Sequence, residues 1–434
     1  MRTRTTFTRS VLIGLFFLAA AGSFAAGEFR AAITKVDITP HNPQWLLGYS
    51  PRQSTGIHDR LYHRIAVLDD GRTQFVLVSS DFCSFSPALY DAFAARLESE
   101  TGIRRTQLWW TVTHTHSAPK LGPPGLGRVF MPERYHEDYD HAYTEEVQKS
   151  LLDGIRQARS RLVPATLEAG TGMAMANINR RARTSQGQIE LGLNPYGPAD
   201  RQIGLLRLKR ADGSLLGLIV NYAMHGTVLS GKNQLISGDA PGIVAAYVEE
   251  KLGAPMLYIN GAAGNMAPLY TGRDDFRSSH IQEFEVLLGD RIIAAQRDLA
   301  LRAQPVQLLA LEKIVETPRR PNLGWDDSLA AYARAAGDGS SLVRLPVRFL
   351  KLSNEVVIWA APVELFCEVA MEVRNASPFP FTFYFGYANG SFGYFPTREA
   401  FSEGGYEVRT SCLTSRAEVD VTQAVMAQLQ GMIR

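Results

Sequence analysis

The stretch Leu108–Ser117, LWWTVTHTHS, decides the fold more than any other segment of this sequence. Its first half, Leu108–Val112, is a run of bulky and β-branched residues that predicts a buried strand. Its second half places His114 and His116 directly after that strand. Ligands of open α/β sheets gather at the carboxyl ends of strands. The stretch therefore predicts an α/β domain with a functional site at a strand end.

Other apolar, β-rich runs repeat this arrangement along the chain. The predicted strands are 74–79, 215–222, 256–259 and 356–360. Helical patterns alternate with them at 88–99, 143–162, 242–252, 279–301 and 417–433. Such alternation favours an α/β fold, and mixed sheets are expected because some strand pairs have no helix between them. We predict a single large domain of mixed β-sheets packed with helices, with the functional site at the C-terminal ends of the strands.

The histidines after these strands are candidate metal ligands. If the strand continues through His114 and His116, both side chains leave the same face, so they can share a metal or divide ligand and proton-transfer roles. A hydrogen-bonded histidine pair at a strand end is an equally good interpretation. Together with His225, which follows the 215–222 strand, the pair supplies the nitrogen ligands that a zinc site needs. The other six histidines are expected to be solvated: His41, His58, His63, His136, His141 and His280.

Three further residues are ambiguous when taken alone. Glu364 follows an apolar strand and a Pro, and it is expected to open a helix, where an acidic residue is common because of the helix dipole. Tyr394 and Tyr406 flank a turn-rich segment and, taken alone, would be interpreted as packing residues. Only a larger pattern gives these three residues a functional meaning.

The N-terminus and the overall charge bear on location and partners. Arg2, Arg4 and Arg9 precede the apolar run 11–21, and small residues follow up to Ala26. This order is typical of a secretory signal peptide, so we expect 1–26 to be removed and the protein to be secreted or periplasmic. The chain has 45 Lys and Arg against 43 Asp and Glu, which gives no basic field for nucleic acid. No transmembrane segment is expected in the mature chain, and the three cysteines allow at most one disulfide.

Nine segments, in the same order, resemble the catalytic domain of neutral ceramidases. They are Lys35–Pro40, Gly56–Asp69, Thr113–Ser117, Asn179–Arg180, His225–Thr227, Ser237–Asp239, Gly264–Pro268, Pro362–Glu364 and Tyr394–Glu399. The ordered set spans nearly all of residues 27–434, which are expected to form one ceramidase-like zinc hydrolase domain.

Carried over position by position, the resemblance implies a complete site. It implies zinc (Zn²⁺) ligands at His114, His225, Glu364 and Tyr394. It also implies proton transfer by His116, and contacts from Arg180 and Tyr406 to the acyl oxygen or to the anion that forms on it. Imidazoles and a carboxylate are good zinc ligands, and a cation with a phenol stabilises an oxyanion.

Two departures from the family pattern bear on the substrate. The family has a Ser in a Gly-Asp-x-Ser-Pro segment, whereas this chain has Ala267 at the Ser position and Asn265 at the Asp position. The sequence also ends soon after its last predicted helix, without the C-terminal β-domain that follows in ceramidases. Both departures disfavour ceramide itself as the substrate.

The leading interpretation is a zinc-dependent hydrolase in which zinc-activated water cleaves an amide (N-acyl) bond of a lipid or another small molecule. A zinc-dependent esterase, lactonase or sugar-substituent hydrolase would show the same site residues. A non-catalytic ceramidase-like binding protein is a third possibility. It is disfavoured because every expected ligand position has the residue type that the family pattern requires. A barrel metal hydrolase would need more metal-binding His and Asp residues at later strand ends than His225 supplies. The sequence leaves the oligomeric state open.

Overall fold

An eight-stranded mixed sheet forms the larger part of the fold. The computed structural model describes residues 28–271, 280–298 and 305–433, so the expected signal peptide 1–26 lies outside the described residues. The sheet has the order β14-β12-β11-β8-β1-β5-β6-β7, and only the β12–β14 and β6–β7 pairs are parallel. Its strands are β1 (Arg30–Asp37), β5 (Tyr62–Asp69), β6 (Gln74–Ser80), β7 (Leu108–Val112), β8 (Val163–Met173), β11 (Gln202–Arg210), β12 (Leu215–Tyr222) and β14 (Met256–Asn260).

A five-stranded sheet packs against the larger one. Its order is β16-β18-β19-β21, with β17 paired to β18, and β19–β21 is its parallel pair. Its strands are β16 (Leu309–Pro318), β17 (Ala333–Ala335), β18 (Ser341–Lys351), β19 (Val356–Ala360) and β21 (Phe381–Phe385). One apolar core contains residues of both sheets, for example Leu77 and Ile259 from the larger and Ile358 and Phe383 from the smaller.

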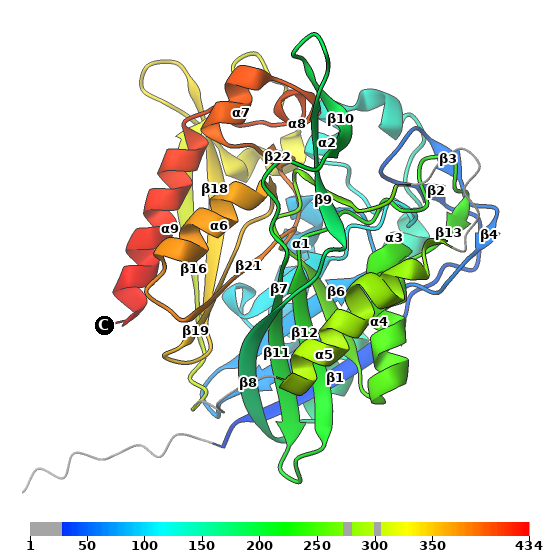
Figure 1. The fold of residues 1–434 in the computed structure, drawn as a ribbon. Coiled ribbons are helices and arrows are strands. Elements are labelled where there is room, and N and C mark those ends of the chain that lie inside the picture. The colour runs from blue at the N-terminus through cyan, green and yellow to red at the C-terminus, as the bar shows by residue number, and fades with distance from the viewer. Residues whose placement is uncertain (1–27, 272–279, 299–304, 434) are drawn as a thin grey trace, which may run out of the picture.

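Helices cover the outer face of each sheet, which gives four layers in the order helix, sheet, sheet, helix (Figure 1). The larger sheet is covered by α1 (Pro87–Thr101), α3 (His141–Ser160), α4 (Asp239–Leu252) and α5 (Asp290–Asp298). The smaller sheet is covered by α6 (Cys367–Ala376) and α9 (Ala417–Ile433). None of the helices in the described ranges is both long enough and apolar enough for a bilayer span.

Short helices and strands complete the described part of the chain. The short helices are η1 (Arg105–Gln107), α2 (Leu126–Phe130), η2 (Pro132–Tyr135), η4 (Glu285–Gly289), η5 (Asp327–Tyr332), α7 (Arg398–Glu403) and α8 (Tyr406–Arg409). The strands of the small sheets are β2 (Trp45–Leu46), β3 (Arg52–Gln53), β4 (Gly56–Ile57), β9 (Asn177–Arg183), β10 (Ile189–Asn194), β13 (Leu235–Ile236), β15 (Met266–Pro268), β20 (Glu364–Leu365) and β22 (Tyr394–Phe395).

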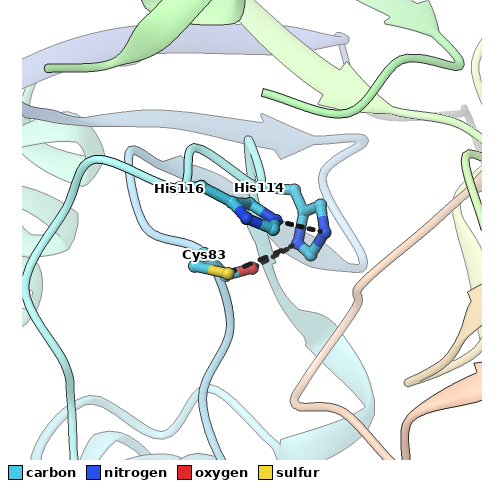
Figure 2. A group of neighbouring side chains, drawn as sticks. All are labelled: Cys83, His114 and His116. Atoms are coloured by element: carbon cyan, nitrogen blue, oxygen red, sulfur yellow. Dashed lines mark hydrogen bonds between the residues drawn. The ribbon is translucent and has the colours of Figure 1, made fainter. Parts of the chain in front are cut away.

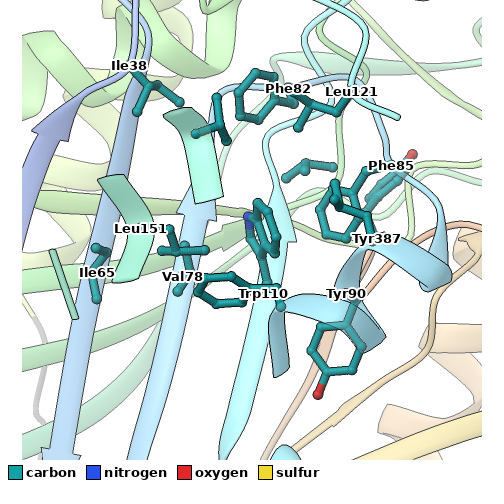
Figure 3. Close-up of a cluster of buried hydrophobic side chains, with 14 of the residues drawn as sticks. Ile38, Ile65, Val78, Phe82, Phe85, Tyr90, Trp110, Leu121, Leu151 and Tyr387 are labelled. Atoms are coloured by element: carbon teal, nitrogen blue, oxygen red, sulfur yellow. The ribbon is translucent and has the colours of Figure 1, made fainter. Parts of the chain in front are cut away.

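The alternation of side chains along β7 explains why two cores form. Trp109 and Trp110 are both fully buried, but they point to opposite faces of the sheet. Trp109 lies in the core between the sheets, where it contacts Phe75 and Phe385. Trp110 packs under α1 and lies among the side chains of the helix-covered core (Figure 3). Burying one such indole stabilises the fold by about 4–6 kcal/mol at about 25 cal/mol per Å².

Several expected elements have the predicted bounds. β7, β12, β19 and α9 begin and end where the sequence pattern places them, and the mixed sheets are confirmed. In the described part of the helix expected over 279–301, a π-helical turn, η4, precedes α5. Residues 279 and 299–301 of that range lie outside the described residues. Half-buried strands such as β1 and β16 gave no continuous apolar run and were not predicted.

Two expectations about single side chains need correction. His63 was expected to be solvated, but it is fully buried in β5, where its ring nitrogens contact the Ser80 hydroxyl at 2.6 Å and the Val147 carbonyl at 3.1 Å. Two good hydrogen bonds offset the cost of burying the ring. The sequence allowed one disulfide, whereas all three cysteines are buried free thiols in the structure.

Candidate metal and catalytic site

The polar residues that follow the strands converge at one end of the two sheets. β7 leads to His114, β12 leads to His225, and β19 leads through a short turn to Glu364. Glu364 does not open a helix as expected: it lies in β20, and α6 begins only at Cys367. β20 pairs in parallel with β22, so that Glu364 and Tyr394 are direct neighbours across the pair. This short pair, invisible in the sequence pattern, places two of the expected ligands side by side.

His114 and His116 meet for a different reason from the one the sequence suggested. The strand ends at Val112 and does not continue through the two histidines. His114 has a φ of +65°, a conformation that non-glycine residues rarely adopt and that often occurs at functional sites. The turn is fixed by the hydrogen bond from the His116 amide to the Gly226 carbonyl, 2.8 Å. It brings the Nε2 atoms of the two rings to 3.3 Å.

His114, His225 and Glu364 form a buried cluster with its donor atoms turned inward. Glu364 Oε2 lies 3.3 Å from His114 Nε2 and 3.4 Å from His225 Nε2. This oxygen is buried and has no hydrogen-bond partner among the described residues. The three donor atoms lie within 4.8 Å of one another. Such an oxygen, flanked by two imidazole nitrogens, has the chemistry of a cation site, because buried polar atoms otherwise find partners.

The far side of each ring is held by a backbone carbonyl. His114 Nδ1 lies 2.6 Å from the Cys83 carbonyl, and His225 Nδ1 lies 3.1 Å from the Met266 carbonyl. A carbonyl only accepts, so both rings donate through Nδ1 and direct Nε2 toward the cluster. Histidine ligands of metals are typically oriented by such an outer hydrogen bond. The residues present therefore fit a zinc ion bound through the two Nε2 atoms and the Glu364 carboxylate.

Cys83 makes a second possible metal group with His114 and His116 (Figure 2). Its sulfur lies 3.9 Å from His114 Nδ1, but that nitrogen already donates to the Cys83 carbonyl. The first cluster is therefore the better zinc site, because both of its rings direct Nε2 toward the Glu364 carboxylate. Cys83 orients the histidine through its backbone carbonyl and not through its thiol. The sequence did not reveal this role, because a backbone contact does not depend on the residue type.

The charges of the cluster depend on one another. Burial alone would raise the pKa of Glu364, but the neighbouring His114 holds it well below its usual value. Burial alone would lower the pKa of His114, but the Glu364 carboxylate outweighs burial and raises it. For His225, burial and the positive charge of Arg180 lower the pKa to about 3. A proton on His114 thus balances Glu364 in the metal-free protein, and a bound cation would replace that proton.

Arg180 and Tyr394 complete the group around His225. Arg180 Nη1 donates to His225 Nε2 at 2.9 Å, and the Tyr394 hydroxyl lies 3.4 Å from the same nitrogen. One lone pair cannot serve both a guanidinium and a metal, so metal binding requires this Arg180 contact to be released. Arg180 Nη2 is buried and has no partner. A free N–H of this kind can donate to an oxygen of a bound molecule.

Arg180 is held in place by a carboxylate that the sequence did not reveal. Glu407 is buried, and its two oxygens accept from Arg180 Nε at 3.0 Å and from Arg181 Nη1 at 2.9 Å. Two arginines need a counter-charge when they are removed from water. Nothing in the local pattern distinguishes Glu407 from other acidic residues, except that it follows Tyr406.

Tyr406 lies at the border of the site. Its ring packs edge-on against Tyr394, with 5.6 Å between ring centres, and its hydroxyl contacts the sulfur of Met131 at 3.4 Å. Burial raises the pKa of the Tyr406 phenol, so the group stays protonated at neutral pH. A thioether is a weak acceptor, so the hydroxyl is free to donate to a better one.

A hairpin in the N-terminal part of the chain holds His116. Gly48 has a φ of +114°, and a Cβ there would lie 2.5 Å from the His116 ring. Tyr49 packs edge-on against the same ring at 5.0 Å, and Arg52 donates to the His116 carbonyl. His116 is thus confined between the hairpin and the metal cluster. The sequence gave no signal for these contacts, because the residues are more than 60 positions apart.

The segment that departs from the family pattern has a structural role. Asn265 donates to Glu368 at 2.7 Å and accepts from the Cys367 amide at 3.0 Å, which joins the segment to the start of α6. Ala267 lies in β15, opposite Ile178 of β9, and its methyl group lines a pocket at the site.

Two pockets meet at the cluster. The first has a cavity volume of about 70 Å³ and reaches Glu364, His114 and His116. The second has a cavity volume of about 340 Å³ and reaches His116 and Arg180. Five residues line both of them: Gly48, His116, Arg134, Tyr394 and Tyr406. The second pocket has the size of a small-molecule site, and the first is a narrow extension of it at the cluster.

These observations define the class of protein: a four-layer α/β/β/α fold with a buried His–His–Glu cluster at its strand ends. The family model described as neutral/alkaline non-lysosomal ceramidase, N-terminal, matches residues 29–267. The chain belongs to this family, which confirms the resemblance seen in the sequence.

Individual relatives agree with this membership. The neutral ceramidase of Pseudomonas aeruginosa is 26% identical over 338 residues, covering 73% of this chain and 49% of the relative. Neutral ceramidase 1 of Arabidopsis thaliana is 26% identical over 249 residues, covering 54% of this chain and 31% of the relative. The chain thus spans about half the length of the first relative and about a third of the second.

Two solved structures share the fold. The crystal structure of the Pseudomonas aeruginosa neutral ceramidase has a TM-score of 0.74 at 18% identity and covers 94% of this chain and 74% of its own. A ceramidase complexed with C2 has a TM-score of 0.76 at 18% identity, covering 93% and 75%. The mixed α/β architecture with several sheets is therefore that of the neutral ceramidases.

Proposed function

We propose that this protein is a secreted, zinc-dependent hydrolase that cleaves an N-acyl amide bond. The observation that carries the proposal is the buried Glu364 oxygen, which faces His114 Nε2 and His225 Nε2 at 3.3 and 3.4 Å. The relatives are named ceramidases, and ceramide is an N-acyl amide, which favours an amide over an ester. Secretion rests on the signal-like pattern of residues 1–26.

In this proposal His114, His225 and Glu364 hold the metal, and the Tyr394 hydroxyl is the fourth ligand. A bound zinc ion supplies Lewis-acid chemistry, which polarises a carbonyl and acidifies water. Two imidazoles, a carboxylate and a phenol are a donor set that zinc accepts.

His116 is the proton-transfer residue. Burial, together with the positive charge of His114, lowers the pKa of His116, so its ring is neutral at neutral pH. A neutral ring with Nε2 facing the cluster takes a proton from the attacking water and passes it to the leaving nitrogen as the C–N bond breaks. Gly48 and Tyr49 keep the ring from turning away.

Arg180 and Tyr406 stabilise the charge on the acyl oxygen. Arg180 Nη2 has no partner, and the Tyr406 hydroxyl has only a sulfur as its acceptor. Donors that are already oriented by the protein, as Arg180 is by Glu407, lower the barrier because they need no rearrangement.

The test is metal analysis combined with an amide-hydrolysis assay on the purified protein. We expect about one zinc per chain, because the three or four protein ligands form a single site. We also expect that a chelator abolishes the hydrolysis. His225→Ala should lose both metal and activity, whereas His141→Ala, on an exposed helix end, should keep both. Full zinc content in His225→Ala would refute the ligand assignment.

A further inference from the structure

Arg134 occupies a distinctive place between the two pockets. It lies in η2 and lines both pockets, together with His116, Tyr394 and Tyr406. Its Nη1 donates to the Gly48 carbonyl at 3.1 Å. Among residues 28–271, 280–298 and 305–433, no carboxylate lies within ion-pair distance of its guanidinium. An arginine at the junction of two pockets, without a counter-charge, is available to an anion that enters them.

The charge of the surrounding surface points the same way. Of the described residues that line the first pocket, Glu364 is the single acidic one, and its oxygens face the histidine cluster. The described lining of the second pocket has no acidic residue, and it includes Arg180 in addition to Arg134. Arg180 is already neutralised by Glu407, but Arg134 is not. The pockets therefore favour an anionic molecule over a neutral one.

The first pocket also has an apolar lining. Apolar side chains contribute to it, among them Leu47, Phe85, Leu121 and Phe130. An acyl chain that lies along these side chains would bring its amide near the cluster, beside Arg134. In an N-acylated α-amino acid the carboxylate carbon is two bonds from the amide nitrogen. The carboxylate of such a substrate therefore lies close to the cleaved bond, just as Arg134 lies beside the metal cluster.

We infer that the substrate is an N-acylated amino acid and that Arg134 binds its carboxylate. This inference rests on the proposed amide hydrolysis and narrows its substrate class. Water adds to the acyl carbonyl, the C–N bond breaks, and the products are a fatty acid and an amino acid whose nitrogen has gained the proton. A neutral N-acyl amine offers no negative charge to Arg134, so the charge-assisted contact is absent.

The experiment compares two substrates of similar size on three proteins. N-octanoylglycine carries the carboxylate, and N-octanoylethanolamine replaces it with a hydroxymethyl group. The zinc-loaded natural protein should show a kcat/KM about 10- to 100-fold higher for the glycine compound, as expected for hydrogen bonds to a charged group. Arg134→Gln should remove this preference, so that the ratio of kcat/KM for the two compounds approaches one. Arg128→Gln is the matched control, since Arg128 lies exposed on the neighbouring helix α2 and should keep the preference.

Two outcomes overturn the inference: equal rates on the two compounds for the natural protein, or an unchanged preference in Arg134→Gln. If the natural protein cleaves neither compound, the proposed amide hydrolysis fails, and calorimetric binding of the same two compounds decides the role of Arg134. Tighter binding of the glycine compound that is lost in Arg134→Gln supports the carboxylate site. Equal binding of both compounds refutes it.

Discussion

Replacing Glu407 with Gln tests whether the site depends on a charge that does not touch the metal cluster. Glu407 is buried and faces two arginines, Arg180 at 3.0 Å and Arg181 at 2.9 Å. Arg181 also contacts Glu403, but Arg180 has no other carboxylate partner among the described residues. The substitution keeps the shape of the side chain and removes its charge, so that Arg180 is left buried without compensation.

The magnitude follows from the burial of the pair. Removing one partner of a buried ion pair costs about 3–5 kcal/mol. With an unfolding entropy of about 2.1 cal/mol/K per residue over the 434 residues, this loss lowers the Tm by about 3–5 °C. Losing an oxyanion donor lowers kcat by about 10²–10³-fold. An Arg180 that is present but misplaced should lower kcat by at least about tenfold. Because the ligands of the metal are unchanged, the zinc content should stay the same.

The assay measures Tm, zinc content, kcat and KM for the natural protein, Glu407→Gln and Glu403→Gln. Glu403 belongs to the same cluster, but its side chain is 26% exposed, so its loss should cost about 0–1 kcal/mol. We expect a lower kcat with a similar KM in Glu407→Gln and near-natural behaviour in Glu403→Gln. If the two variants have the same Tm and the same kcat, Glu407 does not position Arg180 and the reasoning is wrong.

Four further predictions test other parts of the structure. His116→Ala should retain zinc while turnover falls about 10²–10⁴-fold, and a joint loss of metal would make His116 a ligand. Gly48→Ala should lower kcat, because its Cβ would lie 2.5 Å from the His116 ring; unchanged kinetics would show that the hairpin yields freely. The natural protein should cleave a short-chain ceramide slowly and Ala267→Ser should cleave it faster, whereas efficient cleavage by both alike would contradict the importance of the missing hydroxyl. Burial lowers the pKa of His63 from 6.5 to about 4, so the unfolded chain binds the proton more readily. Its contribution to stability is therefore complete above pH 6.5 and is lost as the pH falls toward 4, by about 3 kcal/mol in total, and His63→Gln should flatten this part of a denaturation-against-pH curve.

Local pattern was a good guide for several strands that are buried on both faces, although β5 and β21, which are equally buried, were not predicted. β7, β12 and β19 are continuous apolar runs, and each was predicted with its bounds. The convergence of His114, His225 and Glu364 was also predicted, because strand ends lie at an edge of the sheet. Half-buried strands escaped prediction, since their apolar residues alternate with exposed ones over too few positions.

The sequence by itself therefore determined the α/β class, the family and the residues that carry the candidate chemistry, because these depend on short-range periodicity and on the order of motifs. Only the tertiary structure decided how those residues are held. The turn at His114, the pairing of Glu364 with Tyr394 and the Arg180–Glu407 contact each depend on where distant segments meet. An ion pair between residues 227 positions apart leaves no local trace, because either charge alone would look like a solvated surface residue.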